Sequence, residues 1–301
     1  MTKGKARILK GVGGLYTAEQ FDSSETISCR AKGSFRRDGI KPLPGDIIEY
    51  ELQKDGTGFI TSICERKNSL IRPSSANIDL FIFVISAAKP DPDLFLIDKM
   101  LAVATYNAID VLIIVNKLDL DGNYAKELCD IYTLSGYKTV MFSANSPEPE
   151  KVALIREYAK GKVSFFAGAS GVGKSSTINA VFPELGFTLE TGELSEKIER
   201  GKHTTRKTEL FKISENTYIA DTPGFSMLEI AQYNMIPKKD LLFAFPDLEN
   251  FSAGCRYNDC SHVREEGCNV ICAIENGKIA PSRHTSYKLL FEELKNKNDW
   301  E

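Results

Sequence analysis

The sequence has no apolar run near the ~20 residues needed to cross a bilayer, so no membrane span or membrane partner is expected. Its basic start, residues 1–14, is not followed by an apolar core or a small-residue cleavage site, and we expect no signal peptide. Internal repeats and low-complexity tracts are also absent. With 42% hydrophobic and 26% charged residues among 301, the composition is that of a soluble globular protein with two or three compact units. These observations favour the cytoplasm.

A large excess of charge of one sign is missing as well. The net charge of −3 argues against a protein that coats nucleic acid with its whole surface. The charge is unevenly distributed, since residues 1–72 hold 13 Lys and Arg against 9 Asp and Glu, whereas residues 241–301 hold 7 against 10. A basic first segment on an acidic chain indicates a polyanionic partner.

The first 71 residues predict a small β-barrel. Short alternating stretches such as "TISCRAKGSF" and "DIIEYELQ" are separated by the turn signals "RRDG", "PLPGD" and "KDGTG". Several short strands at this spacing are typical of a barrel. An OB-like barrel fits the length of residues 1–71, and a five-stranded SH3-like barrel would leave a similar pattern. Residues 72–77, "RPSSAN", read as a linker.

Residues 72–238 read as an α/β domain, and residues 239–301 as a loop-rich domain that ends in a helix. Continuous apolar runs predict strands buried on both faces, and they alternate with stretches of helical spacing. This alternation indicates a parallel sheet covered by helices, followed by a hairpin in residues 207–221. The expected strands are 78–87, 108–116, 138–144 and 162–168, and the expected helices are 93–107, 124–136 and 149–161.

A phosphate-binding loop is predicted between a strand and a helix. Residues 168–175, "GASGVGKS", fit the pattern G-x-x-x-x-G-K-[ST], follow the apolar "VSFFA" and precede the helix-like "SSTINAVF". The glycines allow backbone N–H groups to surround a β-phosphate, Lys174 can reach the β and γ oxygens, and the Ser175 hydroxyl can bind Mg²⁺. The nucleotide-binding residues expected here are Gly168, Ala169, Ser170, Gly171, Val172, Gly173, Lys174, Ser175 and Ser176.

The tetrapeptide "NKLD" at 116–119 indicates that the base is guanine. The Asp119 carboxylate can accept hydrogen bonds from N1–H and the exocyclic amine of guanine, whereas adenine presents an acceptor at N1. A P-loop ATPase or kinase is therefore disfavoured. Asn116 would connect the base loop to the phosphate loop, the Lys117 stem would cover the purine, and "SAN" at 143–145 would offer a backbone N–H to the guanine carbonyl. The base-binding residues expected are Asn116, Lys117, Leu118, Asp119, Ser143 and Ala144.

Two further segments resemble the switches of a nucleotide hydrolase. "DTPG" at 221–224 would hold Mg²⁺ through water with Asp221 and meet the γ-phosphate with the Gly224 N–H. The polar stretch "ERGKHTTRKTEL" contains Thr205, our preferred Mg²⁺ ligand, with Thr204 as the alternative. The expected ligands of Mg²⁺ are therefore Ser175, Thr205 and Asp221.

The position after "DTPG" has a hydrophobic residue. Many GTPases place a glutamine there to orient the attacking water, but Phe225 has no hydrogen-bonding group. His is the commonest general base, and we hypothesise that His203 positions the water. The catalytic residues expected are thus His203 and Thr205.

These elements occur in an unusual order, because the base-reading "NKLD" precedes the phosphate loop. A parallel sheet tolerates such a change, since moving the chain break preserves spatial neighbours. The order predicts a circularly permuted GTPase in which the segment after "DTPG" leads directly into the C-terminal domain. The nucleotide state could then move that domain as a lever.

Four of the seven cysteines crowd into one short stretch, which in a reducing compartment favours metal binding over disulfides. Cys255, Cys260, His262 and Cys268 follow the spacing Cys-x4-Cys-x-His-x5-Cys, a closed ligand set suited to one structural Zn²⁺. Cys272 competes as a fourth ligand, and a Cys₄ site without His262 is the alternative. Because this stretch has few apolar residues, the metal would supply folding energy.

Taken together, these features resemble the RsgA (YjeQ) family of small-ribosomal-subunit biogenesis GTPases over nearly the whole chain. The resemblance rests on the OB-like start ending in "ERKNSLIRP", the order "NKLD", "GASGVGKS", "GKHTTR", "DTPGF", and the cysteine cluster. It implies a monomeric, bacterial, cytoplasmic enzyme that hydrolyses GTP to GDP. It also implies the small (30S) ribosomal subunit and its 16S rRNA as partner and activator late in maturation, with the barrel and zinc domain on the RNA. Phe225 matches the hydrophobic residue that the family has after "DTPG". The segment "HTTR" departs from the family's commoner "HTTT". The family's metal ligands favour His262 over Cys272 as the fourth ligand.

Two other functions remain open at this point. A circularly permuted GTPase serving the large subunit typically lacks both the barrel and the cysteine cluster. An RNA-binding module made of the barrel and the zinc domain, with vestigial hydrolysis, would leave the nucleotide residues without a purpose.

Overall fold

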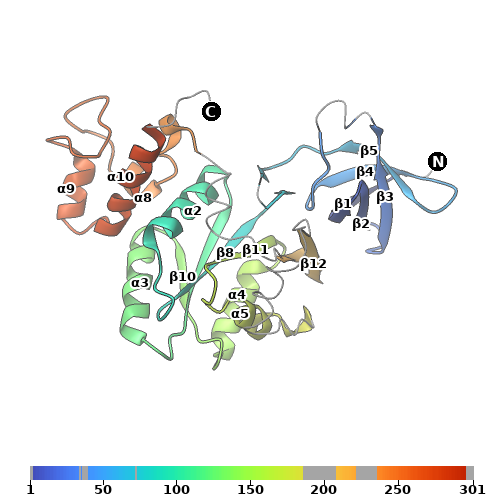
Figure 1. The fold of residues 1–301 in the computed structure, drawn as a ribbon, viewed down its shortest axis with the longest axis horizontal. Coiled ribbons are helices and arrows are strands. Elements are labelled where there is room, and N and C mark those ends of the chain that lie inside the picture. The colour runs from blue at the N-terminus through green and yellow to red at the C-terminus, as the bar shows by residue number, and fades with distance from the viewer. Residues whose placement is uncertain are drawn as a thin grey trace, which may run out of the picture. The chain divides into compact units, whose positions relative to one another are not determined.

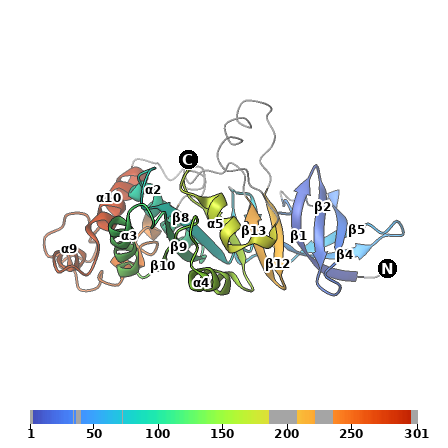
Figure 2. The same cartoon turned by 90° about the horizontal axis from the view of Figure 1, so that it is seen from below.

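A computed structural model describes residues 3–33, 35, 40–71, 73–185, 208–221 and 236–295, with the backbone alone for Asp221 (Figures 1 and 2). His203, Thr204, Thr205, Gly224 and Phe225 lie outside the described residues. Within these ranges no helix has the length and apolar character required to traverse a bilayer.

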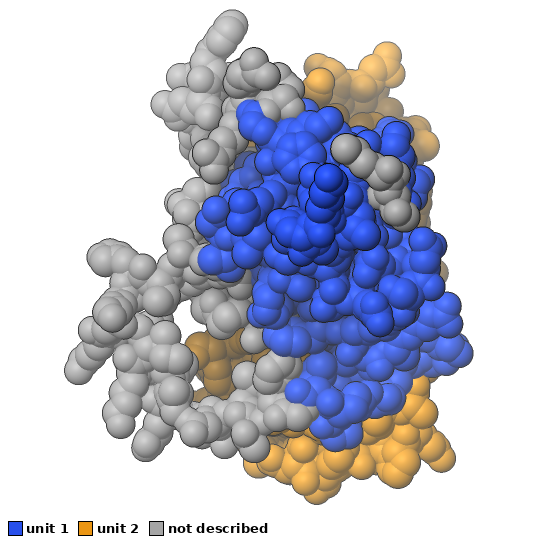
Figure 3. All heavy atoms as spheres, turned by 90° about the vertical axis from the view of Figure 1, so that its right-hand side faces the viewer, with its two compact units in different colours: residues 1–80, 156–166, 182–225 blue, residues 81–155, 167–181, 226–301 orange. Residues whose placement is uncertain are grey.

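The chain forms two compact units, coloured separately in Figure 3. Unit 1 comprises residues 1–80, 156–166 and 182–225, and unit 2 comprises residues 81–155, 167–181 and 226–301. The sequence predicts domains instead by their motifs, with the limits 1–71, 72–238 and 239–301. These limits stay a prediction.

Unit 1 begins with a closed barrel in the strand order β1-β2-β3-β5-β4. Strand β1 pairs antiparallel with both β2 and β4, which closes the barrel, and β3 pairs in parallel with β5. This order is that of the OB-like barrel, one of the two barrels compatible with the sequence. The strands are β1 (Lys3–Val12), β2 (Leu15–Gln20), β3 (Thr26–Ala31), β4 (Ile47–Leu52) and β5 (Gly58–Ile63).

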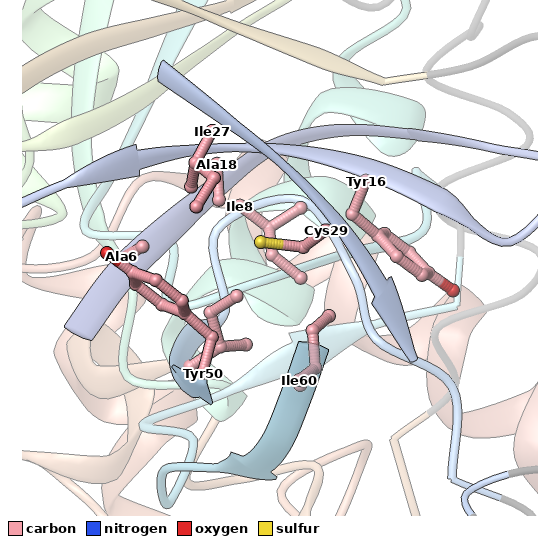
Figure 4. Packing of buried hydrophobic residues seen from close by; sticks show 9 residues of the cluster. Ala6, Ile8, Tyr16, Ala18, Ile27, Cys29, Tyr50 and Ile60 are labelled. Carbon is pink, nitrogen blue, oxygen red and sulfur yellow. The ribbon is translucent and has the colours of Figure 1, made fainter. Parts of the chain in front are cut away.

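Alternate residues of these strands point into the barrel and form its core, as Figure 4 shows. The alternation follows from the two-residue period of a strand, which sends successive side chains to opposite faces. The core residues are Ala6, Ile8, Tyr16, Ala18, Ile27, Cys29, Ile48, Tyr50 and Ile60.

The predicted linker at 72–77 is in part a strand. Ser75–Ala76 form β7, which pairs with β6 (Ser69–Leu70). The Ala76 N–H donates to the Pro44 carbonyl at 2.9 Å, and Asn77 Nδ2 donates to the Gly45 carbonyl at 3.0 Å. These bonds attach the segment to the barrel's own loop, so its backbone is held by tertiary contacts that its turn-forming residues do not reveal.

The predicted α/β domain is confirmed by a six-stranded sheet in the order β10-β9-β8-β11-β13-β12. Strand β9 pairs in parallel with β10, β11 pairs in parallel with β13, and β12 closes the edge antiparallel to β13. Every residue of β8 is buried, as expected for a strand covered on both faces. The strands are β8 (Leu80–Ser86), β9 (Asp110–Asn116), β10 (Lys138–Met141), β11 (Val163–Ala167), β12 (Glu209–Ser214) and β13 (Thr217–Asp221).

Helices follow the strands, and aspartates cap two of them. The Asp93 side chain accepts from the Leu96 N–H at 3.0 Å, and the Asp121 side chain accepts from the Tyr124 N–H at 2.9 Å. Such caps satisfy backbone donors that the first helical turn leaves free. The cap at Asp121 starts a helix directly after "NKLD". The helices are α2 (Leu94–Tyr106), α3 (Gly122–Leu134), α4 (Pro149–Ala159), α5 (Lys174–Val181) and the short η1 (Pro183–Leu185).

The C-terminal part of unit 2 contains η2 (Lys238–Asp240), α8 (Pro246–Glu249), α9 (Asn269–Glu275) and α10 (Pro281–Lys295). Figure 1 shows α10 beside α2.

A fully buried ion cluster joins α10, α2 and α8. Arg283 on α10 has no exposed surface, and its Nη1 donates to Asp98 Oδ1 of α2 at 2.8 Å. Its Nε and Nη2 donate to the two carboxylate oxygens of Asp247 of α8 at 2.9 and 3.0 Å. The guanidinium also lies 4.6 Å from the ring centroid of Phe245. One cation thus serves two buried carboxylates.

Replacing Arg283 with Met is therefore expected to destabilise the protein by about 3–5 kcal/mol, the usual cost of removing one partner of a buried ion pair. Asp98 and Asp247 would stay buried without their donor. The free energy of unfolding in urea measures the effect. Arg156→Met is the matched control, because Arg156 pairs with Glu184 at a half-exposed position, where about 0–1 kcal/mol is expected. Equal losses in the two variants would contradict the assignment.

Candidate nucleotide site and metal centre

The predicted phosphate loop lies between β11 and α5, which begins at Lys174. A Cβ atom at Gly168 would lie 2.3 Å from the Val84 carbonyl oxygen. A Cβ atom at Gly173, whose φ is +92°, would lie 2.3 Å from Asn116 Nδ2. Both positions therefore require glycine, because any side chain would collide with neighbouring polar groups of the site.

Lys174 folds back over this loop. Its Nζ donates to the carbonyl oxygens of Gly168 at 2.8 Å and Ala169 at 2.7 Å. Burial lowers the pKa of Lys174 to about 8, which still leaves the ammonium largely charged at pH 7. A bound polyanion would favour the charged form further. Ala169 and Ser170 are exposed at the tip of the loop, and Ser175 and Ser176 follow in the first helical turn.

The Asn116 side chain connects the two loops that bear the motifs. Its Nδ2 donates to the Val172 carbonyl of the phosphate loop at 2.9 Å, and its Oδ1 accepts from the Ala144 N–H at 3.0 Å. Asn116 is buried, so these bonds satisfy polar atoms that solvent does not reach. The structure thus brings the "NKLD", "SAN" and phosphate-loop segments together.

Lys117 crosses from the base loop to the phosphate loop. Its backbone has φ +65°, in the left-handed region, and its Nζ donates to the Gly171 carbonyl at 2.8 Å. The same ammonium donates to the Lys89 carbonyl. These two bonds direct the stem of Lys117 along the loops and leave its ammonium hydrogen-bonded.

The loop after β8 was not recognised from the sequence. Besides the Lys89 carbonyl, it brings Pro90 close to the phosphate loop, since a Cβ atom at Gly171 would lie 3.6 Å from Pro90 Cδ. One signal was available. The loop follows the carboxyl end of a buried parallel strand, and such ends form the ligand-binding edge of α/β sheets.

Asp119 is exposed but its carboxylate is oriented. Ser143 Oγ donates to Asp119 Oδ1 at 2.6 Å, and Asn145 Nδ2 lies 3.5 Å from Oδ2. The hydrogen bond from Ser143 is the main cause that lowers the pKa of Asp119, which is therefore ionised at neutral pH. The Leu118 N–H donates to the Phe142 carbonyl at 3.1 Å and attaches the base loop to the end of β10. This carboxylate can accept two parallel N–H donors.

Asp221 is the last residue of β13 and pairs with Glu209 of β12. Since β13 runs parallel to β11, with Phe165 opposite Ala220, both strands end at the same edge. The other predicted switch residues, His203, Thr205 and Gly224, lie outside the described residues.

The predicted metal ligands form one cluster. The donor atoms of Cys255, Cys260, His262 and Cys268 all lie within 4.8 Å of one another. His262 Nδ1 is 3.4 Å from Cys268 Sγ and 3.6 Å from Cys255 Sγ. Cys272 is exposed and is not part of this group. Three sulfurs and one imidazole nitrogen are the donors that a structural metal such as Zn²⁺ prefers.

Hydrogen bonds from residues that are not ligands hold the loop that carries the four ligands. The Asn269 N–H donates to Cys255 Sγ at 3.3 Å, and His284 Nε2 donates to the His262 carbonyl at 2.7 Å. Burial lowers the pKa of His262, so its imidazole is neutral at pH 7, the form that binds metal.

Glu265 organises the same loop. It accepts from the backbone N–H groups of Ser261, Val263 and Arg264 at 3.0, 2.9 and 3.0 Å. Burial opposes ionisation, but the hydrogen bonds outweigh it and lower the pKa of Glu265 to about 2. The ligand loop is thus organised around the Glu265 carboxylate, which is not itself a ligand. The donor set of the cluster fits a metal ion.

Comparisons with known proteins cover nearly the whole chain. Residues 63–231 match the family model described as RsgA GTPase, and residues 5–60 match the RsgA N-terminal domain. A "Small ribosomal subunit biogenesis GTPase RsgA" of Caldanaerobacter subterraneus subsp. tengcongensis is 42% identical over 298 residues, 99% of this chain and 98% of the relative. The protein of the same name from Agathobacter rectalis is 40% identical over 306 residues, 98% of this chain and 99% of the relative.

Two solved structures are similar over the same extent. The crystal structure of YjeQ from Thermotoga maritima has a TM-score of 0.83 and 34% identity, covering 99% of this chain and 100% of the other. The crystal structure of YloQ, described as a circularly permuted GTPase, has a TM-score of 0.78 and 32% identity, covering 99% of this chain and 96% of the other.

Proposed function

The chain belongs to the RsgA GTPase family, and on that premise we propose that it hydrolyses GTP as a step in the maturation of the small ribosomal subunit. The observation that carries the guanine assignment is the oriented Asp119 carboxylate, fixed by Ser143 at 2.6 Å. Asn116 connects this base-reading loop to the phosphate loop at Val172. Base and phosphate recognition are therefore parts of one hydrogen-bonded arrangement.

The proposed contacts with GTP follow from this arrangement. Asp119 accepts from the guanine edge, the Ala144 N–H is available to the guanine carbonyl, and the Lys117 stem covers one face of the base. Lys174 exchanges its two loop carbonyls for the β and γ phosphate oxygens. Mg²⁺ supplies charge neutralisation when bound, and the oxygen donors of Ser175, Thr205 and Asp221 are of the hard kind that it prefers.

The hydrolytic water is proposed to be oriented by His203. Replacing His203 with Ala is expected to lower GTP turnover by about 10²–10⁴-fold, the usual contribution of a general base, with GTP affinity unchanged. Turnover measured at saturating GTP and a fluorescent GTP-analogue titration separate the two effects. Lys202→Ala, one residue earlier in the same segment, is the control. Full turnover in His203→Ala would contradict this role.

We further propose that the small subunit, through its 16S rRNA, stimulates hydrolysis by a monomeric protein in the bacterial cytoplasm. The basic barrel segment supports a polyanionic partner. GTP turnover should be measured alone and with purified small subunits, large subunits or naked rRNA, and stimulation by small subunits is expected. Stimulation by large subunits alone would favour the large-subunit alternative. A lack of turnover in every condition would favour an RNA-binding module with vestigial hydrolysis.

The cysteine cluster is proposed to hold one structural Zn²⁺ through Cys255, Cys260, His262 and Cys268. The four donors fill a tetrahedral set, so no position remains for a substrate. Elemental analysis is expected to find one zinc per chain.

A further inference from the structure

The barrel of unit 1 holds the hairpin formed by β12 and β13. Glu19, the next-to-last residue of barrel strand β2, accepts a hydrogen bond from the Tyr218 hydroxyl of β13 at 3.0 Å. The Lys212 ammonium of β12 donates to the other oxygen of the same carboxylate. Lys212 and Tyr218 are direct cross-strand partners, so one barrel carboxylate holds both strands of the hairpin at the same level.

This contact is buried. Glu19 is 4% exposed and Tyr218 is 2% exposed. Burial, followed by the charge of Glu19, raises the pKa of Tyr218 to about 12, so its hydroxyl stays a donor at physiological pH. The Arg7 guanidinium of β1 lies 5.0 Å from the Tyr218 ring centroid. A buried ion pair adds little net stability over an apolar pair of similar size, but its bonds are directional. The contact is therefore suited to fixing the position of the β12–β13 hairpin on the barrel.

The hairpin that Glu19 holds includes Asp221, the proposed Mg²⁺ ligand. Tyr218 precedes Asp221 by three residues on the same strand, a separation of roughly 10 Å at ~3.3 Å per residue. Asp221 is paired with Glu209 of β12, and Glu209 in turn accepts from Lys10 of β1 at 2.7 Å. The barrel thus contacts the hairpin at the level of Tyr218 and again at the residue opposite Asp221.

We propose that Glu19 is a positioning residue for GTP hydrolysis: through Tyr218 and Lys212 it holds the β12–β13 hairpin so that Asp221 is presented correctly at the end of β13. This inference rests on the proposed function, because Asp221 is there a ligand of the magnesium ion through water. Its consequence is that the barrel belongs to the hydrolytic apparatus, so a partner bound to the barrel can change hydrolysis through this contact.

The test uses the full chain with Tyr218→Phe, Glu19→Gln and the double variant. Tyr218→Phe removes only the hydroxyl, and Tyr50→Phe is its control, since the Tyr50 hydroxyl donates to Gln20 within the barrel at 2.6 Å. Glu49→Gln is the control for Glu19→Gln, because Glu49 is a half-exposed barrel carboxylate paired with Lys5. Two quantities are measured: the Mg²⁺ concentration needed to slow release of a fluorescent GDP analogue, and kcat and KM for GTP.

In Tyr218→Phe the required Mg²⁺ concentration is expected to rise about tenfold, since a hydrogen bond to a charged group is lost. It should rise at least as much in Glu19→Gln, because Lys212 and Tyr218 use both oxygens of Glu19 and glutamine keeps only one uncharged acceptor. The double variant should not exceed the larger single effect, because both changes act on one contact. The kcat should fall with KM for GTP unchanged, and both controls should match the unaltered chain.

A purely structural contact would lower the melting temperature of Tyr218→Phe and leave its Mg²⁺ dependence unchanged, and that result would overturn the proposal. If Glu19→Gln does not fold, Tyr218→Phe decides alone. Absence of GTP turnover in the unaltered chain, with and without small subunits, would overturn the proposed function itself. Turnover in the unaltered chain with unchanged Mg²⁺ dependence in both variants would overturn only the role of Glu19.

Discussion

A Cys260→Ser variant is expected to lose its metal and to unfold the segment that contains the cysteine cluster, whereas a Cys272→Ser variant keeps both. Within residues 251–268 only His262 and Cys268 are buried, so the segment has almost no apolar core of its own. Structural Zn²⁺ binding contributes roughly 10–16 kcal/mol of apparent free energy in small zinc domains at pH 7. With Zn²⁺ bound as proposed, losing one of four ligands would remove a large part of the free energy that folds this segment.

The two variants make the same chemical change at cysteines 12 residues apart, which makes Cys272→Ser a matched control. Cys272 is exposed and lies outside the cluster, and its sulfur accepts a hydrogen bond from Asn276 Nδ2 at 3.3 Å. Zinc content of the purified chains and amide hydrogen exchange across residues 251–268 measure the outcome. Metal retained in Cys260→Ser, or lost equally in Cys272→Ser, would show that the ligand set is wrong.

Replacing Asp119 with Asn is expected to convert the protein from a GTP-binding to an XTP-binding one. Guanine offers two N–H donors to the carboxylate, and each charge-assisted bond contributes about 1.5–3 kcal/mol, so GTP affinity should fall roughly 10²–10⁴-fold. Xanthine carries a carbonyl in place of the exocyclic amine, and the Asn amide can donate to that oxygen. Affinity for XTP should therefore rise in the same variant.

Asp121→Asn is the control for this change. Asp121 lies two residues further on and caps α3, accepting from the Tyr124 N–H at 2.9 Å, and Asn caps helices about as well as Asp. Competition of GTP and XTP for a bound fluorescent analogue gives both affinities. If Asp119→Asn binds GTP like the unaltered chain, or loses both nucleotides together, Asp119 does not read the base.

The parts of the site that were predictable from sequence are those whose chemistry is contained in a few adjacent residues. "GASGVGKS" needs its glycines for the turn itself, and the Cβ positions at Gly168 and Gly173 agree with that requirement. The strands and helices of the α/β domain were predictable as well, because buried strands leave continuous apolar runs. The Lys89 carbonyl was not, because a backbone atom carries no residue-type signal.

Long-range contacts were beyond the sequence pattern for a related reason. Glu19 and Tyr218 are 199 residues apart, and Arg283 and Asp98 are 185 apart. Nothing in the local sequence of either pair distinguishes these residues from ordinary solvent-facing polar residues of a strand or helix. Burial requires these groups to pair, because an unpaired ion that is removed from water destabilises the folded state by several kcal/mol.

By itself, the sequence determined which groups are available for chemistry: the Asp119 carboxylate, the glycine-rich loop at 168–175, a set of sulfur and nitrogen donors, and the permuted order in which they occur. The tertiary structure decided which of several chemically similar segments and side chains come into contact. It closed the barrel in the OB-like order, left Cys272 outside the metal cluster, and placed the β12–β13 hairpin against Glu19. The physical reason is that a motif's chemistry is carried by residues a few positions apart in the sequence. Which of several chemically similar side chains come into contact depends instead on how distant segments pack.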